Sequence, residues 1–462
     1  MWILSHCLTV LGFALCLLLI VRLFRAHRAP GVTMAWLLAI VLIPYVGVPA
    51  YLLFGGRKLK RMASRKATLF GVPGEDSAGD DSSRRTTERV LVTAGMPPAR
   101  RGNHIEFLPD GEAGFESLTA LIEGAKRSIH LMTFILRRDA TGRAIVDLLA
   151  RKAAEGVEVR LLLDALGCFR SYGRFVDPLR DAGGKVETFM PVLPLRRKWS
   201  ANLRNHRKIA VFDGRTALIG GMNLACEYMG AAPNPDRWLD TGAVITGPAA
   251  CDFDAVFASD WEFACDESLQ PAGGIEPATG AEAALSTAQM AASGPDTPGD
   301  ALYEAIITAT MEAKDRIWIV TPYFIPDEAL FNALMLQARL GLDVRIVVPR
   351  RSNHLMADLA RGHSLRELAG LGARVFTCPR MIHAKLMLFD SDLAVTGSAN
   401  VDLRSFYLNY EVQLFMYSAP DVEAVVRWME LRMAEAGQLE VAPISPAREW
   451  AEDISALVAP LL

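Results

Sequence analysis

Two stretches of this chain are copies of one another, about 180 residues apart. In the first, Ala125–Thr133 is followed by a helical stretch rich in Ala and Leu and then by Gly156–Leu163. In the second, Ala313–Thr321 is followed by a similar helical stretch and then by Gly341–Val348. Each copy is typical of a helix end, a short β-branched strand, a helix and a second strand. Strands spaced by helices indicate βαβ units, so the duplication predicts two tandem α/β domains with helices on both sheet faces.

Polar segments rich in Gly, Pro, Ser and Asp separate these blocks from each other and from the N-terminus. They predict five parts in the 462 residues. The parts are an apolar N-terminal segment (1–56), a basic exit and linker (57–104), a first α/β domain (105–268), a second linker (269–300) and a second α/β domain (301–462).

The N-terminus holds two long apolar runs. Trp2–Val21 contains no acidic or basic residue except His6, and Ala29–Gly56 contains none. As a helix, the first run would measure about 30 Å, the thickness of one hydrocarbon core. A secretory signal peptide is the alternative, but the basic start and a clear cleavage site are missing. Pro44 and Pro49 make the second run either a kinked span or a re-entrant one. We expect a hairpin of two transmembrane helices.

Basic residues predict the orientation of this hairpin. Three arginines lie in the connection 22–28, whereas six basic residues lie in the exit 57–66. The positive-inside rule places the exit and the two α/β domains in the cytoplasm, beside a membrane that the chain crosses more than once. The exit cluster is either only a topology signal or also a site for anionic headgroups. The same alternatives, headgroup docking or a solvated loop, hold for Arg196–Trp199.

Composition excludes several classes of protein. The chain has 49 basic and 52 acidic residues and 51% apolar residues, so it is neither disordered nor a nucleic-acid binder held by net charge. Its seven cysteines show no paired spacing. They indicate free thiols in a reducing compartment, with no disulfide framework and no zinc site.

One motif, His-x-Lys-x-x-x-x-Asp, occurs once in each block. The chain has only eight histidines and ten lysines, so two such matches do not arise by chance. An asparagine in a turn of small residues follows each histidine at the same spacing of 17 residues. The candidate catalytic residues are His206, Lys208, Asp213, His383, Lys385 and Asp390, and the candidate phosphate-binding residues are Asn223, Asn400 and Ser398.

These residue types suit an anion that must be attacked. On a strand, residues i and i+2 face the same side, so each histidine and its lysine present their side chains to one space. Lysines supply charge to phosphate oxygens and amides donate hydrogen bonds. One imidazole can be the nucleophile and the other the acid for the leaving alcohol. Without thiolates or a carboxylate cluster, the set is poor for a metal.

Four carboxylates lie near the motifs. A nucleophilic histidine needs a partner on its other ring nitrogen, and Asp240 and Glu411 stand at comparable strand starts downstream. We expect them to orient the imidazoles; the alternative is that they are exposed acids at strand ends. Asp213 and Asp390 end their strands at turns, so a turn-forming or loop-holding role competes with a chemical one.

The paired motifs resemble the phospholipase D superfamily, and further segments resemble the bacterial cardiolipin synthases within it. The similarity covers nearly the whole chain. Segments that carry it are Ala35–Ala39, Tyr51–Gly56, Arg204–Ile209, Gly220–Leu224, Thr321–Asp327 and Gly397–Phe406.

The resemblance implies two phospholipase D-like αβα domains about a pseudo-twofold axis, with one shared active site at their interface. It also implies phosphatidyl transfer that needs neither metal nor cofactor. A phosphatidyl-histidine forms, glycerol leaves, and the glycerol hydroxyl of a second phosphatidylglycerol resolves the intermediate. The family usually uses the first-motif histidine as nucleophile, which corresponds to His206, with His383 as acid and then base.

The sequence therefore predicts a membrane-bound phosphatidyltransferase that forms cardiolipin. Its expected partners are phosphatidylglycerol and anionic membrane lipids, without nucleic acid. One alternative is a phosphodiesterase that hydrolyses phospholipid or nucleic acid, since only the attacking group differs. A non-catalytic membrane scaffold is another. The order of the two histidines, the donor lipid and the oligomeric state remain open.

Overall fold

The computed structural model describes residues 15–21, 30–45, 47–48, 51, 66–70, 85–191, 203–270 and 285–458. The chain divides into two compact units, Met1–Arg65 and Lys66–Leu462, and each is considered by itself.

The first unit contains α2 (Pro30–Leu42), which carries no charged residue. Leu19, Ile40 and Tyr51 are buried together, and Trp36 meets the Tyr51 ring edge to face at 5.3 Å. Within the described ranges, no helix combines the length and the apolar content that crossing a bilayer requires. Much of the predicted hairpin, including residues 1–14 and 22–29, lies outside these ranges.

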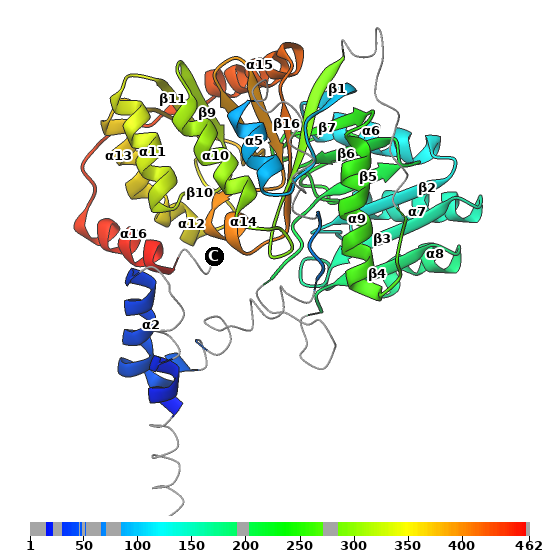
Figure 1. Cartoon of the computed structure of the whole chain (residues 1–462), viewed down its shortest axis with the longest axis horizontal. Helices are drawn as coiled ribbons and strands as arrows, with labels where there is room; N and C mark the ends of the chain where they lie inside the picture. Colours follow the sequence, from blue (N-terminus) through cyan, green and yellow to red (C-terminus); the bar gives the residue numbers. More distant parts are fainter. Residues whose placement is uncertain are drawn as a thin grey trace, which may run out of the picture. The chain divides into compact units, whose positions relative to one another are not determined.

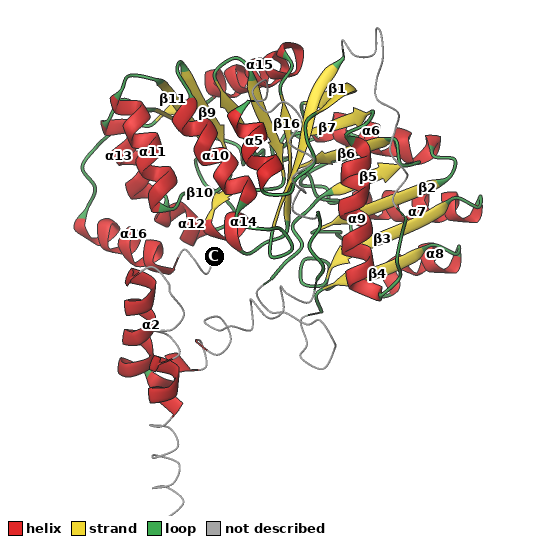
Figure 2. Ribbon diagram, in the orientation of Figure 1, coloured by secondary structure: helices red, strands yellow, loops and turns green. Residues whose placement is uncertain are grey.

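The second unit is built on one mixed sheet of 15 strands, flanked by helices (Figures 1 and 2). Its two halves repeat the same strand order outward from the central pair β1 and β8. From the centre, the first half runs β1 (Arg100–Leu108), β7 (Gly242–Thr246), β6 (Thr216–Gly220), β5 (Ile209–Phe212), β2 (Ser128–Thr133), β3 (Glu158–Asp164) and β4 (Lys185–Phe189). The second half runs β8 (Ser286–Ser293), β16 (Glu411–Met416), β14 (Leu393–Gly397), β13 (Leu386–Phe389), β9 (Arg316–Val320), β11 (Asp343–Pro349), β12 (Arg374–Cys378) and β17 (Gly437–Gln438).

The two halves join where β1 and β8 pair antiparallel, with Arg100 opposite Ala288 and Asn103 opposite Ser286. The predicted tandem α/β duplication is therefore confirmed, and the two sheets are continuous. A separate two-stranded sheet pairs β10 (Phe324–Ile325) with β15 (Val401–Asp402) in parallel.

The predicted βαβ units occupy the outer part of each half. Strands β2, β3 and β4 are parallel, as are β9, β11 and β12. The strands nearer the centre are antiparallel. Parallel neighbours need a long crossover connection, whereas turns such as Asp213–Gly214 between β5 and β6 are too short for one.

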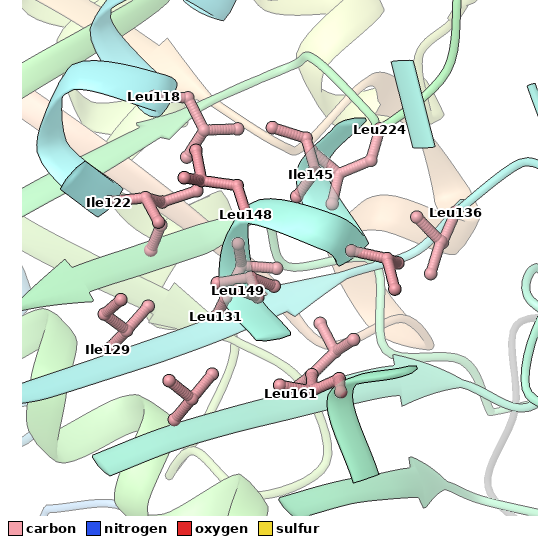
Figure 3. Close-up of a cluster of buried hydrophobic side chains, with 14 of the residues drawn as sticks. Leu118, Ile122, Ile129, Leu131, Leu136, Ile145, Leu148, Leu149, Leu161 and Leu224 are labelled. Carbon is pink, nitrogen blue, oxygen red and sulfur yellow. The ribbon is translucent and has the colours of Figure 1, made fainter. Parts of the chain in front are cut away.

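Helices cover both sheet faces. In the first half, His130 of β2 stacks on Phe257 of α9 at 4.8 Å, whereas the next residue, Leu131, packs under α6 and α7. Figure 3 shows Leu118 and Ile122 of α6 meeting the leucines of α7 above Leu131. The helices are α5 (Thr86–Thr93), α6 (Gly111–Gly124), α7 (Ala140–Ala154), η3 (Arg174–Val176), α8 (Asp177–Asp181), α9 (Ala250–Cys265), α10 (Ala301–Glu312), α11 (Glu328–Arg339), α12 (Leu355–Ala360), α13 (Gly362–Gly370), α14 (Leu403–Tyr407), α15 (Ala419–Glu435) and α16 (Pro446–Val458).

Both segments predicted as linkers contain regular structure. The segment 57–104 holds α5 and the start of β1, and the segment 269–300 holds all of β8. Composition misleads here because β8 is short and rich in small residues, yet it pairs with β16 on one side and β1 on the other. The predicted second linker therefore contributes a central strand.

Candidate active site

The two motif histidines enter their strands against the opposite half of the molecule. His206 lies just before β5, and its backbone N–H donates to the carbonyl of Tyr410 at 2.9 Å. His383 lies just before β13, and its N–H donates to the carbonyl of Leu239 at 2.7 Å. Each motif is thus anchored on the other half by backbone hydrogen bonds.

The side chains of the histidines repeat this exchange. His206 Nδ1 lies 2.9 and 3.0 Å from the carboxylate oxygens of Glu411 in the second half. His383 Nδ1 lies 2.6 Å from Asp240 Oδ2 in the first half. The structure therefore places both expected carboxylates at the imidazoles, and they are fully buried rather than exposed strand-end acids. The crossing of the two pairs between halves has no signal in the sequence.

The carboxylates stay ionised in this buried site. Burial raises the pKa of Glu411, but His206 and Lys208 outweigh it and leave that pKa lowered. Likewise burial raises the pKa of Asp240, and His383 outweighs it. An ionised carboxylate at Nδ1 accepts the N–H there, which leaves the lone pair of each imidazole on Nε2.

The motif lysines are buried close to their histidines. Lys208 Nζ donates to the backbone carbonyl of His206 at 2.7 Å, and Lys385 Nζ donates to that of His383 at 2.6 Å. Lys385 Nζ also lies 3.0 and 3.3 Å from the two ring nitrogens of His383. Burial lowers the pKa of Lys208 to about 7 and that of Lys385 to about 8.

The same burial makes the imidazoles neutral. Burial lowers the pKa of His206 below its ordinary value. Burial, followed by the charge of Lys385, lowers the pKa of His383 to about 3. At neutral pH the site thus offers two uncharged imidazoles, each with Nε2 unprotonated, beside two lysines whose pKa values lie close to neutral pH.

Aromatic side chains wall the two histidines. Phe134 meets the His206 ring edge on at 4.9 Å. Tyr228 and Trp238 contact the His383 ring at 4.9 and 5.6 Å. Sequence reasoning missed all three because isolated aromatics in a loop carry no motif. They restrict ring rotation and exclude water from the imidazole faces.

The polar residues of the small-residue turns have different tasks. Asn223 Oδ1 accepts from the backbone N–H of Ile135 at 3.1 Å and so holds the segment that follows β2. Asn400 is buried, and its Oδ1 has no hydrogen-bond partner among the described residues. Ser398 Oγ donates to Glu411 Oε2 at 2.5 Å. Its hydroxyl proton thus fixes the Glu411 carboxylate in this structure, and phosphate binding by Ser398 stays a prediction.

Asp213 and Asp390 lie at the far ends of their strands from the histidines. Each lies seven positions after its histidine, about 23 Å along an extended chain. Both residues have left-handed backbone at turns, with φ of 53° and 52°. The Asp213 carboxylate accepts the backbone N–H groups of residues 126–128, and that of Asp390 accepts those of residues 314–316. In the structure these carboxylates hold the loops that begin β2 and β9, and a direct chemical role for either residue stays a prediction.

A buried network of ion pairs is centred on Arg207, which lies between the histidine and the lysine of the first motif. Arg207 donates to Asp260 at 2.8 Å and to Asp296 at 3.1 Å, and its Nε donates to the carbonyl of Glu411 at 3.1 Å. Lys66 contacts both aspartates, lying 2.5 Å from Asp260. Sequence analysis missed this network because Arg207 has an alanine, Ala384, as its counterpart in the second motif. Two cations and two carboxylates balance, so removing one would leave a buried unpaired charge.

The chain is similar to known proteins over most of its length. The family model described as "Cardiolipin synthase, PLD-like domain" matches residues 118–261 and 306–433, and the model "Phospholipase_D-nuclease N-terminal" matches residues 14–56. Cardiolipin synthase A of Pseudomonas entomophila is 34% identical over 430 residues, which cover 90% of this chain and 89% of that protein. The cardiolipin synthase of Geobacillus kaustophilus is 32% identical over 452 residues, 94% of this chain and 90% of that one.

Among solved structures, phosphatidylserine synthase of Haemophilus influenzae Rd KW20 has the same fold. The TM-score is 0.61 at 17% identity, and the match covers 82% of this chain and 100% of the other.

The crossed pairs generate a first prediction. We expect Glu411→Gln and Asp240→Asn each to lower kcat at least about 100-fold with little change in KM, because an amide does not select the Nδ1–H tautomer. Steady-state kinetics on the solubilised protein would measure this. Asp254→Asn is the matched control, since Asp254 bonds His130 Nδ1 at 2.7 Å outside the site. Equal kcat losses in all three variants would contradict the assignment.

A second prediction concerns the loop-holding aspartates. Asp213→Ala and Asp390→Ala leave several backbone amides unpaired, which costs about 1–3 kcal/mol of folding free energy. We expect a lower temperature of unfolding, measured by differential scanning fluorimetry, and turnover per folded molecule close to that of the parent. Loss of turnover at an unchanged unfolding temperature would restore these residues to the chemistry.

Proposed function

The chain belongs to the cardiolipin synthase family of phospholipase D-like proteins, and from this premise we propose that it forms cardiolipin and glycerol from two phosphatidylglycerol molecules. The observation that carries the proposal is the pair of neutral imidazoles, each oriented by a carboxylate of the opposite half beside a buried lysine. Such a centre suits an anionic substrate with a group to transfer, and the similarity to cardiolipin synthases supports an alcohol rather than water as the acceptor.

Substrate binding completes the charge balance of the site. Two lysines face two carboxylates there, so the phosphodiester of phosphatidylglycerol brings an additional negative charge. That charge raises the pKa of Lys208 and Lys385 and keeps both protonated. In this proposal the side-chain N–H of Asn400, a buried residue, donates to a non-bridging oxygen of the phosphate.

Transfer then proceeds in two displacements. His206 Nε2 attacks the phosphorus, the bond from phosphorus to the glycerol oxygen breaks, and His383 gives its Nε2 proton to that oxygen. The imidazolium of the phosphatidyl-histidine is stabilised by Glu411. In the second step His383 takes the proton of the glycerol hydroxyl of another phosphatidylglycerol, whose oxygen attacks phosphorus as the bond to His206 breaks. The protons balance, and His383 ends as it began.

The bound phosphodiester also prepares His383 for its first task. The imidazole is neutral in the empty site, but a phosphate anion beside it favours the protonated form. Asp240 supports the same change, since it accepts the Nδ1–H of the imidazolium. Substrate binding and proton uptake are thus coupled in this mechanism.

Membrane attachment follows from the N-terminal part of the chain. Residues 14–56 match the N-terminal region of the family, and six basic residues follow within residues 57–66. The enzyme is associated with the membrane that holds its substrate. The proposal includes a bacterial inner membrane, two spans and catalytic domains on the cytoplasmic side.

A third prediction tests the reaction. The full-length protein in detergent should convert phosphatidylglycerol to cardiolipin and free glycerol, followed by lipid mass spectrometry. His206→Ala and His383→Ala should each lower the rate at least about 1,000-fold, since each removes a group that acts in both steps. The exposed His363 supplies the matched control, His363→Ala, which should turn over normally.

The outcomes of this experiment separate the rival functions. Phosphatidic acid as the sole lipid product would mean that water attacks the intermediate, and no turnover would mean a scaffold. Rapid quenching in alkali preserves phosphohistidine and identifies the nucleophile by peptide mapping. A phosphatidyl adduct on His383 instead of His206 would reverse the assigned order.

A fourth prediction concerns pH. Both lysines have lowered pKa values, about 7 for Lys208 and about 8 for Lys385, so they are charged at pH 6 and increasingly neutral above pH 8. We expect KM for phosphatidylglycerol to rise between pH 7 and pH 9. Lys208→Arg keeps its charge throughout and should flatten that rise. A KM that stays constant over this range would show that lysine charge does not hold the substrate.

A further inference from the structure

A second basic site lies outside the catalytic centre. A pocket of about 330 Å³ opens on the first half and is lined by Arg138, Asp139, Arg143, Arg174 and Phe175. Arg138 and Asp139 end the connection from β2 to α7, Arg143 lies in the first turn of α7, and the last two residues belong to η3. We propose that this pocket binds the phosphate of an anionic phospholipid.

The positive charge of the pocket is available to a ligand. Both carboxylate oxygens of Asp139 are used by backbone amides, those of Gly142 and Cys226, each at 2.9 Å. Across the described part of the chain, neither Arg138 nor Arg174 has a hydrogen-bond or ion-pair partner. Arg143 also lies 3.8 Å from the Asp147 carboxylate on α7. Three guanidinium groups against two carboxylates leave a formal charge of +1, at the positive end of a 15-residue helix.

Buried hydrogen bonds link the two loops that form the walls of the pocket. Leu136 donates its N–H to Cys168 Sγ at 3.2 Å, and Ser171 Oγ donates to the carbonyl of Leu136. Both Cys168 and Ser171 are buried. The Arg143 guanidinium lies 4.3 Å from the centre of the Phe175 ring. The loop before η3 and the loop after β2 are thus one rigid unit with a preformed concave surface.

The second half of the molecule provides an internal comparison. Asp327 caps α11 through Leu330 N as Asp139 caps α7 through Gly142 N, so the two helix starts correspond. Counted from these caps, Pro326 stands where Arg138 is and Phe331 stands where Arg143 is. The basic pocket is therefore not a by-product of the duplicated fold, because the second copy has the same helix start without the arginines.

The surroundings favour a lipid over a free anion. The loop that leads into η3 exposes Leu166 and Phe169, the latter by 76%. Exposed apolar side chains next to arginines suit the boundary between headgroups and acyl chains. Phe134, which contacts the His206 ring, precedes Arg138 by four residues, at most about 14 Å of chain. A lipid held there lies beside the catalytic centre.

Arginine protection tests the site directly. The full-length His206→Ala protein in dodecyl maltoside would be treated with phenylglyoxal, and modification of each arginine followed by peptide mass spectrometry. Mixed micelles with phosphatidylglycerol should slow modification of Arg138 and Arg174 by about fivefold or more, since a bound phosphate occupies their N–H groups. Arg151, on α7, and Arg427 are exposed internal controls that should react at unchanged rates.

Three results would overturn the proposal. These are unchanged rates at Arg138 and Arg174, equal protection of the two control arginines, or equal protection by phosphatidylcholine, which is zwitterionic. Inorganic phosphate at the same concentration separates the sources: protection equal to that by phosphatidylglycerol would exclude a lipid site. The inference rests on the proposed function only for the choice of phosphatidylglycerol as probe. Because His206→Ala does not turn over, protection is measured independently of whether the parent makes cardiolipin.

Discussion

Each motif histidine takes the partner of its Nδ1 from the opposite half of the molecule. His206 needs Glu411 and His383 needs Asp240, so neither half contains a complete centre. Hydrogen bonds of 2.6–3.0 Å tolerate little displacement, and the halves must therefore hold one fixed relation. The continuous pairing of β1 with β8 and the backbone bridges at Tyr410 and Leu239 supply that relation. The continuous sheet thus holds the two halves in the position that the His206–Glu411 and His383–Asp240 hydrogen bonds require.

Charge balance explains how so many ionisable groups can be buried together. Lys208 and Lys385 face Asp240 and Glu411, and the imidazoles between them are neutral. Desolvation makes each additional charge expensive, so the lysines titrate near neutral pH while the site is empty. A phosphodiester changes this, because its charge makes the protonated lysines favourable. The site is therefore prepared for an anion that arrives together with protons.

Much of this could be predicted from sequence because the signals are local. A period of two along a strand places His206 and Lys208 together, and the repeated spacing identifies their copies. The pairing of His206 with Glu411 bridges 205 positions and has no local signal. Asp213 shows what repetition cannot decide. Its spacing repeats in both copies, and in both the carboxylate holds a loop, but repetition alone does not distinguish a structural role from a chemical one.

The two halves share a fold but surround their histidines differently. The His206 side rests on the Arg207 network and lies near the arginine pocket, whereas His383 is packed between Tyr228 and Trp238 with Lys385 against its ring. A symmetric centre would bind and activate its two substrates alike. Transfer requires a donor that loses glycerol and an acceptor that keeps it, so the two lipids must be held in different places. Residues that differ between the two copies, such as Arg138 and its counterpart Pro326, allow a duplicated fold to hold the donor lipid and the acceptor lipid in different places.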